Sequence, residues 1–306
     1  MMNKIQHFPS RLWRLLALAL PLAACTSEVT DEALPGGASP IAFRTAEVTK
    51  AVVTGFNDGD AFSVWGGYDN NATNVFDGVT VTNSNGSWTY SPYQYWMAGK
   101  TYRFYAVYPT GFGSCDAQGT ITVSNFDSSK GNDLMTAQSN VMNGSNPQQV
   151  AFTFNHLLSR IRCTVKAEQG VTGCSVQALG LYGIYTVGNY NSSSISPWTV
   201  SGSALTADAA LSFITESGGV TPGTPLEGTD MLLIPQALTD TRLHFVYTLN
   251  GQQEETTVNL AESGASMWEI GVAYNYVLTI ESGAINFTLQ VEPWTSASTG
   301  GSIIIQ

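Results

Sequence analysis

Short runs in which apolar and polar residues alternate recur through most of this chain. Clear examples lie at residues 61–65, 102–108, 161–165, 243–249 and 275–280. Alternation with a period of two puts every second side chain on one face of a strand, so each run predicts a half-buried strand. Polar clusters such as 69–71 and 83–86 separate the runs and predict turns. Because no amphipathic stretch is long enough to predict a central helix, we expect an all-β protein.

The length predicts two domains. The chain has 306 residues, and domains usually contain about 100–200. Strand spacing places the division near residues 145–155, which gives an N-terminal β-sandwich at 41–148 and a C-terminal β-sandwich at 149–306. The segment 217–228 is rich in Gly, Thr and Pro, so we expect it to form an exposed loop of the second sandwich.

The amino terminus predicts export. An apolar run at 15–24 ends at a cysteine and follows three basic residues, Lys4, Arg11 and Arg14. The run is too short to cross a bilayer, which takes roughly 20 apolar residues, and it therefore reads as a signal peptide. Its end, Leu22-Ala23-Ala24-Cys25, resembles a lipobox. We expect residues 1–24 to be removed and Cys25 to carry lipid that anchors the protein to a membrane. Residues 25–40 are polar and broken by Pro and Gly, which predicts a flexible tether.

Charge excludes one class of partner. The chain has 12 basic and 23 acidic residues, a formal net charge of −11. Such a surface repels nucleic-acid phosphates, so we expect no nucleic-acid partner.

No pattern predicts catalysis, a metal or a cofactor. Beyond the signal peptide the histidines are His156 and His244. We expect the first to be partly buried and hydrogen-bonded to backbone, and the second to lie on the solvent side of a strand. No local motif marks a carboxylate pair for glycoside hydrolysis. We therefore predict no catalytic residues.

Besides Cys25, the cysteines are Cys115, Cys163 and Cys174, without metal-site spacing. Two interpretations of Cys163 and Cys174 are open: a disulfide across a hairpin, or free buried thiols.

Aromatic residues crowd residues 88–96, as Trp88, Tyr90, Tyr93, Tyr95 and Trp96. They form either an exposed platform that stacks on sugars or part of a sandwich core. We favour the core, because aromatic residues are enriched in packed strands.

Several phrases resemble fimbrillin-like proteins in their order and spacing. They are Ile41-Ala42-Phe43, Gly59-Asp60-Ala61-Phe62-Ser63-Val64-Trp65-Gly66, Phe104-Tyr105-Ala106-Val107-Tyr108-Pro109, the run from Val150 to Ile161, Leu232-Leu233-Ile234-Pro235-Gln236, the run from Trp268 to Tyr276, and Val291-Glu292-Pro293-Trp294. Proteins of this family are lipoprotein precursors of type V pilus subunits, both major and minor, in Gram-negative anaerobes. The resemblance implies two tandem transthyretin-like β-sandwiches, surface exposure at the outer membrane, and other pilus subunits as partners.

The resemblance also implies assembly by β-strand exchange. A trypsin-like protease cuts after a basic residue near the first strand, and a neighbouring subunit fills the groove that this strand leaves. Arg44 and Lys50 are the candidate cut sites. We favour Arg44, because an arginine-specific protease does not accept the lysine of Lys50-Ala51. At the other end, Ile303, Ile304 and Ile305 form either the donor strand or the last edge strand of the second sandwich.

We therefore expect a structural or adhesive pilus subunit that is not an enzyme. Its adhesion ligand is expected to be a host or bacterial surface glycan or protein. The alternative is a surface glycan-binding lipoprotein of a polysaccharide-uptake system.

Overall fold

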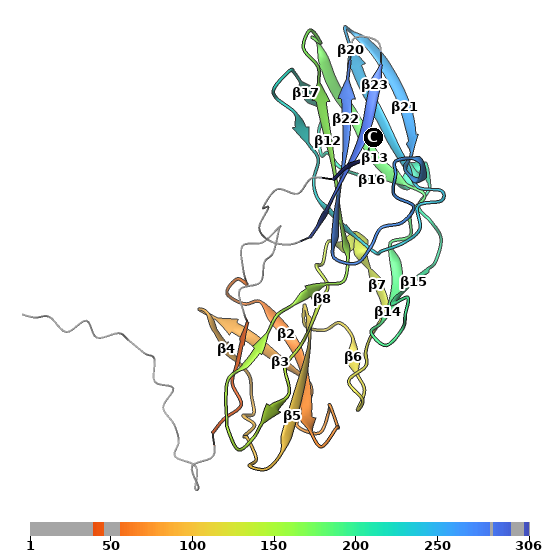
Figure 1. Cartoon of the computed structure of the whole chain (residues 1–306). Coiled ribbons are helices and arrows are strands. Elements are labelled where there is room, and N and C mark those ends of the chain that lie inside the picture. The colour runs from red at the N-terminus through yellow and green to blue at the C-terminus, as the bar shows by residue number, and fades with distance from the viewer. Residues whose placement is uncertain (1–38, 46–55, 282–283, 295–302, 306) are drawn as a thin grey trace, which may run out of the picture. The chain divides into compact units, whose positions relative to one another are not determined.

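The computed structural model describes residues 39–45, 56–281, 284–294 and 303–305, and these residues form an all-β structure (Figure 1). Within these ranges the only helices are three short 3-10 turns, η1 (Ser128–Lys130), η2 (Ala207–Ala209) and η3 (Leu260–Glu262). The predicted all-β class is confirmed.

The N-terminal half is built on a seven-stranded sheet. Its order is β11 (Asn155–His156), β8 (Met135–Gln138), β5 (Thr101–Tyr108), β2 (Ala61–Tyr68), β3 (Phe76–Ser84) and β4 (Ser87–Thr89), with β9 (Met142–Asn143) also paired to β5. A separate two-stranded sheet joins β1 (Phe43–Thr45) to β10 (Val150–Phe152). A mainly aromatic core contains residues from both sheets, including Phe43, Phe62, Phe76, Phe104 and Phe152.

Two further sheets share the core of the C-terminal half. One has the order β18 (Leu226–Glu227), β12 (Ser159–Ala167), β22 (Val272–Ile280), β23 (Ile285–Pro293) and β24 (Ile303–Ile305), with β19 (Met231–Leu233) on β12. The other has the order β16 (Leu211–Ser212), β13 (Cys174–Tyr182), β20 (Arg242–Leu249) and β21 (Gln252–Asn259), with β17 (Gly218–Val220) on β13. At the centre of this core Trp268 donates its indole N–H to the Tyr276 hydroxyl at 2.9 Å, and both side chains are fully buried.

A four-stranded sheet crosses the predicted domain boundary. Its order is β15 (Trp198–Ser201), β14 (Val187–Asn191), β7 (Ile121–Asp127) and β6 (Ser114–Cys115). A third buried cluster likewise mixes residues from both sides of residue 148, such as Val107, Phe126, Leu158, Ile234 and Trp294. The division into two domains stays a prediction.

The expectation of an exposed loop at 217–228 is wrong in part. This segment contains β17 and β18, which pair with β13 and β12, and it buries Val220 completely. Glycine-rich sequence hides these strands because Gly218 and Gly219 carry no side chains that alternate.

Candidate functional site

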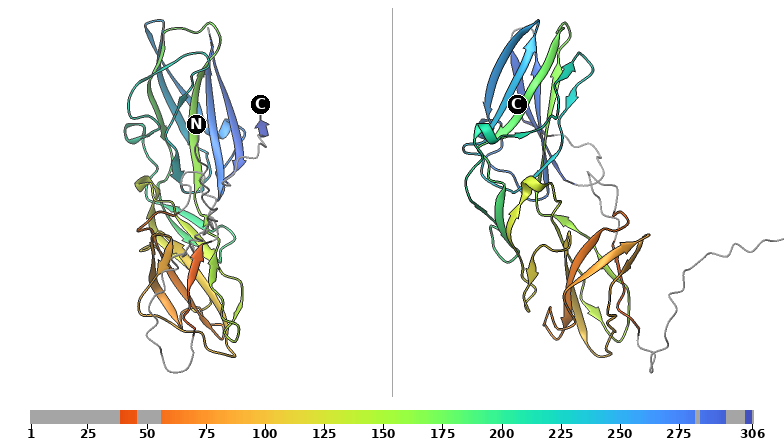
Figure 2. Two further views of the ribbon diagram at one scale, coloured as in Figure 1. Left: turned by 90° about the vertical axis from the view of Figure 1, so that its left-hand side faces the viewer. Right: turned by 180° about the vertical axis from the view of Figure 1, so that it is seen from behind.

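The segment that contains β1 is held by backbone hydrogen bonds on both sides. β1 runs parallel to β10, and the left view of Figure 2 shows the red strand beside the green one. Just before β1, the N–H of Ile41 donates to the carbonyl of Gln94 at 2.8 Å. From the other side, the N–H of Val150 donates to the carbonyl of Ala42 at 2.8 Å. Residues 39–45 therefore lie between β10 and the segment around residue 94.

The side chain of Phe43 fills an aromatic pocket. It is only 1% exposed, and its ring stacks on Phe152 with centroids 5.8 Å apart. Four more rings surround it edge-on at 5.4–6.3 Å, those of Phe62, Phe76, Tyr90 and Phe104. Two residues earlier Ile41 is equally buried, whereas Ala42 and Arg44 are exposed. This alternation puts Ile41 and Phe43 into the core as a pair.

A buried tyrosine fixes the same segment. The Tyr90 hydroxyl donates to the carbonyl of Ile41 at 2.7 Å and accepts from the N–H of Gln94 at 3.2 Å. Burial raises the pKa of Tyr90 to about 12. The phenol therefore stays protonated, and able to donate, through the physiological pH range.

Replacing Tyr90 with phenylalanine is expected to cost about 1–3 kcal/mol at neutral pH, because it leaves the Ile41 carbonyl without its donor. The folded pKa of Tyr90 lies above the ordinary value of 10.0. Its contribution is therefore complete below pH 10 and is lost as the pH rises towards about 12. We expect the stability difference between the wild type and Tyr90→Phe, measured by urea unfolding, to shrink over that interval. The exposed Tyr93, as Tyr93→Phe, is the control; a constant difference would contradict the assignment.

Only one of the two candidate cut sites falls within the described residues. Arg44 is exposed on β1 and lines a polar depression of about 470 Å³. The other polar lining residues are mostly amides, namely Asn140, Asn143, Asn146, Gln148 and Gln149. Among them Gln149 donates its side-chain amide to the carbonyl of Phe43 at 2.9 Å. Lys50 and the predicted lipid-bearing Cys25 lie outside the described residues.

The C-terminal tail pairs with its own sheet. β24 runs antiparallel to β23, with Ile303 opposite Val291 and Ile305 opposite Leu289. Figure 2 shows it as the last strand beside β23. In this structure the three isoleucines thus form an edge strand, and their role as a donor stays a prediction.

The comparison with known families decides what kind of chain this is. The model of the fimbrillin-like family matches residues 49–294. The chain belongs to the fimbrillin-like family. The sequence resemblance is thereby confirmed, and the matched family is one of pilus and adhesion subunits that act at the cell surface. No curated protein matches this fimbrillin-like chain in sequence.

Solved structures share the fold of the fimbrillin-like chain. A candidate cell adhesion protein from Bacteroides uniformis superposes with a TM-score of 0.60 at 20% identity, covering 84% of this chain and 98% of its own. A fimbrial protein from Bacteroides vulgatus superposes with a TM-score of 0.55 at 18% identity, covering 84% of this chain and 99% of its own. A fimbrial assembly protein from Parabacteroides distasonis superposes with a TM-score of 0.51 at 9% identity, covering 88% of this chain and 99% of its own.

The aromatic stretch of this fimbrillin-like chain packs as core. Tyr90 and Trp96 are less than 9% exposed. Trp88 packs against Phe62 with ring centroids 4.8 Å apart. Tyr93 is 48% exposed. Among the described residues its ring contacts one other aromatic ring, that of Tyr90. The core interpretation is confirmed, and the sugar-stacking platform is absent from the described residues.

The two histidines lie in different surroundings. His156 is buried, as expected, but its Nδ1 faces the Asp133 carboxylate at 2.9 Å, so the expectation of a backbone partner is wrong. Its ring also stacks on Trp294 with centroids 3.7 Å apart. Sequence reasoning missed both neighbours, because each lies far along the chain. His244 is partly exposed and pairs with Glu255 at 2.8 Å.

The cysteines of the described residues are free. Cys115, Cys163 and Cys174 are buried and form no disulfide. Of the two interpretations of Cys163 and Cys174, the structure therefore supports free buried thiols. Burial raises the pKa of all three thiols, that of Cys115 to about 12. They are therefore poor nucleophiles.

The described part of the chain contains no group of three metal-ligating side chains. It also contains no helix long and apolar enough to cross a membrane.

Proposed function

We propose that the protein is a structural or adhesive pilus subunit, exported as a lipoprotein through Cys25 and assembled by β-strand exchange at the site that β1 occupies. The observation that carries the proposal is the way β1 is held. The segment 41–45, which contains β1, puts its alternate side chains Ile41 and Phe43 into the aromatic core. Lys50 belongs to residues 46–55, which follow β1 in the sequence and lie outside the described residues. The role is structural and requires no catalytic residue, metal or cofactor.

Energetics support the idea that a cut would free this site. Burial of one large apolar side chain contributes about 1.5–3 kcal/mol, so Ile41 and Phe43 together contribute about 3–6 kcal/mol. A peptide whose binding free energy is only about 3–6 kcal/mol has a dissociation constant above 1 μM, since 1 μM corresponds to about −8 kcal/mol. While the chain is intact the segment cannot diffuse away. After a cut it dissociates at ordinary protein concentrations, and the backbone edge of β10 and the aromatic pocket become available to another strand.

The position of β1 also bears on which bond is cut. A protease binds its substrate as an extended strand, so cleavage after Arg44 requires Phe43 to leave the core first. Lys50 lies five residues beyond Thr45, outside β1. Both bonds separate Ile41 and Phe43 from the body of the protein. The new N-terminus identifies the bond, Thr45 after cleavage at Arg44 and Ala51 after cleavage at Lys50.

The test is limited trypsin digestion of the purified chain that lacks residues 1–25, followed by N-terminal sequencing and size-exclusion chromatography. We expect loss of β1 and then a ladder of oligomers. The double variant Arg44→Gln/Lys50→Gln, which offers no cut site between residues 39 and 60, should remain monomeric. A wild-type body that stays monomeric after losing β1 would contradict strand exchange and leave a stand-alone adhesin.

A further inference from the structure

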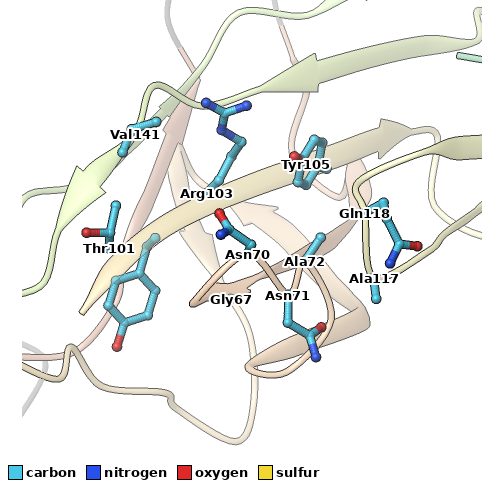
Figure 3. A pocket seen from close by; sticks show the side chains of 11 residues that line it. Gly67, Asn70, Asn71, Ala72, Thr101, Arg103, Tyr105, Ala117, Gln118 and Val141 are labelled. Atoms are coloured by element: carbon cyan, nitrogen blue, oxygen red, sulfur yellow. The ribbon is translucent and has the colours of Figure 1, made fainter. Parts of the chain in front are cut away.

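The face of the N-terminal sheet is hollow around Arg103 on β5. On β2 the residue opposite Arg103 is Gly67, which has no side chain to cover the sheet there. On its other side β5 pairs with β8 through residues 105–108 and with β9 through residues 101–102, so Arg103 has no register partner there. Between those pairings Ser139 still binds β5, because its N–H donates to the carbonyl of Phe104 at 2.9 Å and its hydroxyl accepts from the N–H of Phe104 at 3.0 Å, whereas residues 140–141 have no partner on β5. The result is a depression of about 270 Å³ into which the Arg103 side chain extends (Figure 3).

Two loops form walls around this depression, the first between β2 and β3 and the second between β6 and β7. A Cβ atom on Gly67 would clash with the carbonyl of Asn71 and the side chain of Asn74, so only glycine lets the first loop close over β2. Asn74 holds that loop in place by accepting from the N–H of Tyr68 at 3.0 Å and donating to its carbonyl at 3.1 Å. The N–H of Ala72 donates to the carbonyl of Ala117 in the second loop at 2.9 Å, which joins the two loops.

Three polar side chains in the depression lack partners. Among the described residues, the guanidinium of Arg103 makes no hydrogen bond or ion pair, and neither do the side-chain amides of Asn70 and Gln118. Figure 3 shows Arg103 and Tyr105 extending from β5, with Asn70 beside the foot of Arg103 and Gln118 on the loop beyond Tyr105. The hydroxyls of Thr101 and Tyr105 add further donors and acceptors.

The neighbouring charges are already engaged. Lys100, close by on the chain, pairs with Asp69 at 2.5 Å. One oxygen of Asp116 accepts from the N–H groups of Gln118 and Thr120 at 2.9 and 2.8 Å, and these backbone hydrogen bonds lower the pKa of that carboxyl. Arg103 is therefore an unmatched cation in a chain whose net charge is −11.

The chemistry of the lining indicates the ligand. A guanidinium binds a carboxylate through two parallel hydrogen bonds. Side-chain amides and hydroxyls match the hydroxyl groups of a sugar ring, and the exposed Val141 with Ala72 and Ala117 supplies small apolar contacts for its C–H face. The volume of about 270 Å³ lies just below the usual range for ligand sites, roughly 300–1,000 Å³, which suits a single sugar ring.

We propose that this depression binds one carboxylate-bearing sugar, such as a terminal sialic or uronic acid. The amides and hydroxyls among the lining residues favour a sugar over a peptide, because a sugar ring presents several hydroxyl groups to them. The proposal does not depend on strand exchange, since β1 contributes nothing to the depression.

The test is calorimetric titration of the purified protein with the methyl glycosides of N-acetylneuraminic acid and glucuronic acid. We expect saturable binding of at least one acid with a Kd of about 1 mM, as suits a single small contact site. Methyl galactoside, which has no carboxylate, should not bind. Arg103→Gln should weaken binding at least about tenfold, because the charge-assisted pair is lost. Lys130→Gln, which removes an exposed cation on η1, should leave the Kd unchanged.

Three results would overturn the proposal. The first is no saturable binding of either acid, and the second is equal binding by Arg103→Gln. The third is binding of N-acetylglutamate as tight as that of the sugar acids, which would show a general carboxylate site. Arg103 is exposed on the sheet face, so its variant should fold; circular dichroism and the thermal midpoint check this.

Discussion

Replacing Phe43 with alanine is expected to lower the free energy of unfolding by about 3–5 kcal/mol. The side chain is 1% exposed and meets five aromatic rings, among them the stacked ring of Phe152. Alanine leaves a cavity that these neighbours cannot close, since the rings belong to β2, β3, β5 and β10 as well as to the segment of Tyr90. Natural domains are stable by only about 5–15 kcal/mol, so the loss is a large share of the total.

Urea unfolding followed by tryptophan fluorescence measures this loss. Ile195→Ala is the matched control, because Ile195 is an apolar residue with a fully exposed side chain; its effect should stay within about 0.5 kcal/mol. Phe43→Leu keeps most of the apolar volume and should fall between the two. A loss below about 1 kcal/mol for Phe43→Ala would mean that β1 contributes little to the folded body, and that its removal would not leave a groove worth filling.

The period-two pattern predicted several of the long strands, because those strands have one face in the core. The run at 102–108 matches β5, and the run at 243–249 matches β20. The pattern missed β3, whose register against β2 shifts between Val64 and Gly66. A β-bulge of this kind breaks the alternation that a sequence search relies on. Pairings such as β14 with β7 could not be predicted, since periodicity says nothing about which strands become neighbours.

The candidate site shows the same limit. The phrase Ile41-Ala42-Phe43 marked the first strand through its resemblance to a family, but its parallel partner β10 lies more than 100 residues further along the chain. The Tyr90 hydroxyl that fixes it sits in a stretch whose aromatic residues looked alike in sequence. The hollow at Arg103 likewise depends on Gly67 being its register partner on β2. Such contacts follow from strand register, which the sequence does not display locally.

A disulfide that ties β1 to β10 is expected to abolish assembly completely, on the proposed function, and reduction is expected to restore it. Arg44 and Ala151 are register partners on the parallel strands, and both line the same depression. Neighbouring strands lie about 4.8 Å apart, within the span of about 4.4–6.8 Å that a disulfide bridges between Cα atoms. The variant Arg44→Cys/Ala151→Cys still offers trypsin Lys50, the remaining basic residue between 45 and 60. After that cut the oxidised strand cannot leave its groove.

The measurement is size-exclusion chromatography of the digested variant with and without reductant, with non-reducing electrophoresis to show that the strand is still attached. The three natural thiols of the described residues are buried and should not exchange with the new pair. Arg44→Ser/Ala151→Ser, which makes the same two replacements without the bond, should form oligomers in both conditions. If the oxidised variant forms oligomers as readily as the reduced one, subunits must join through a surface other than the groove of β1, because that groove would still be filled.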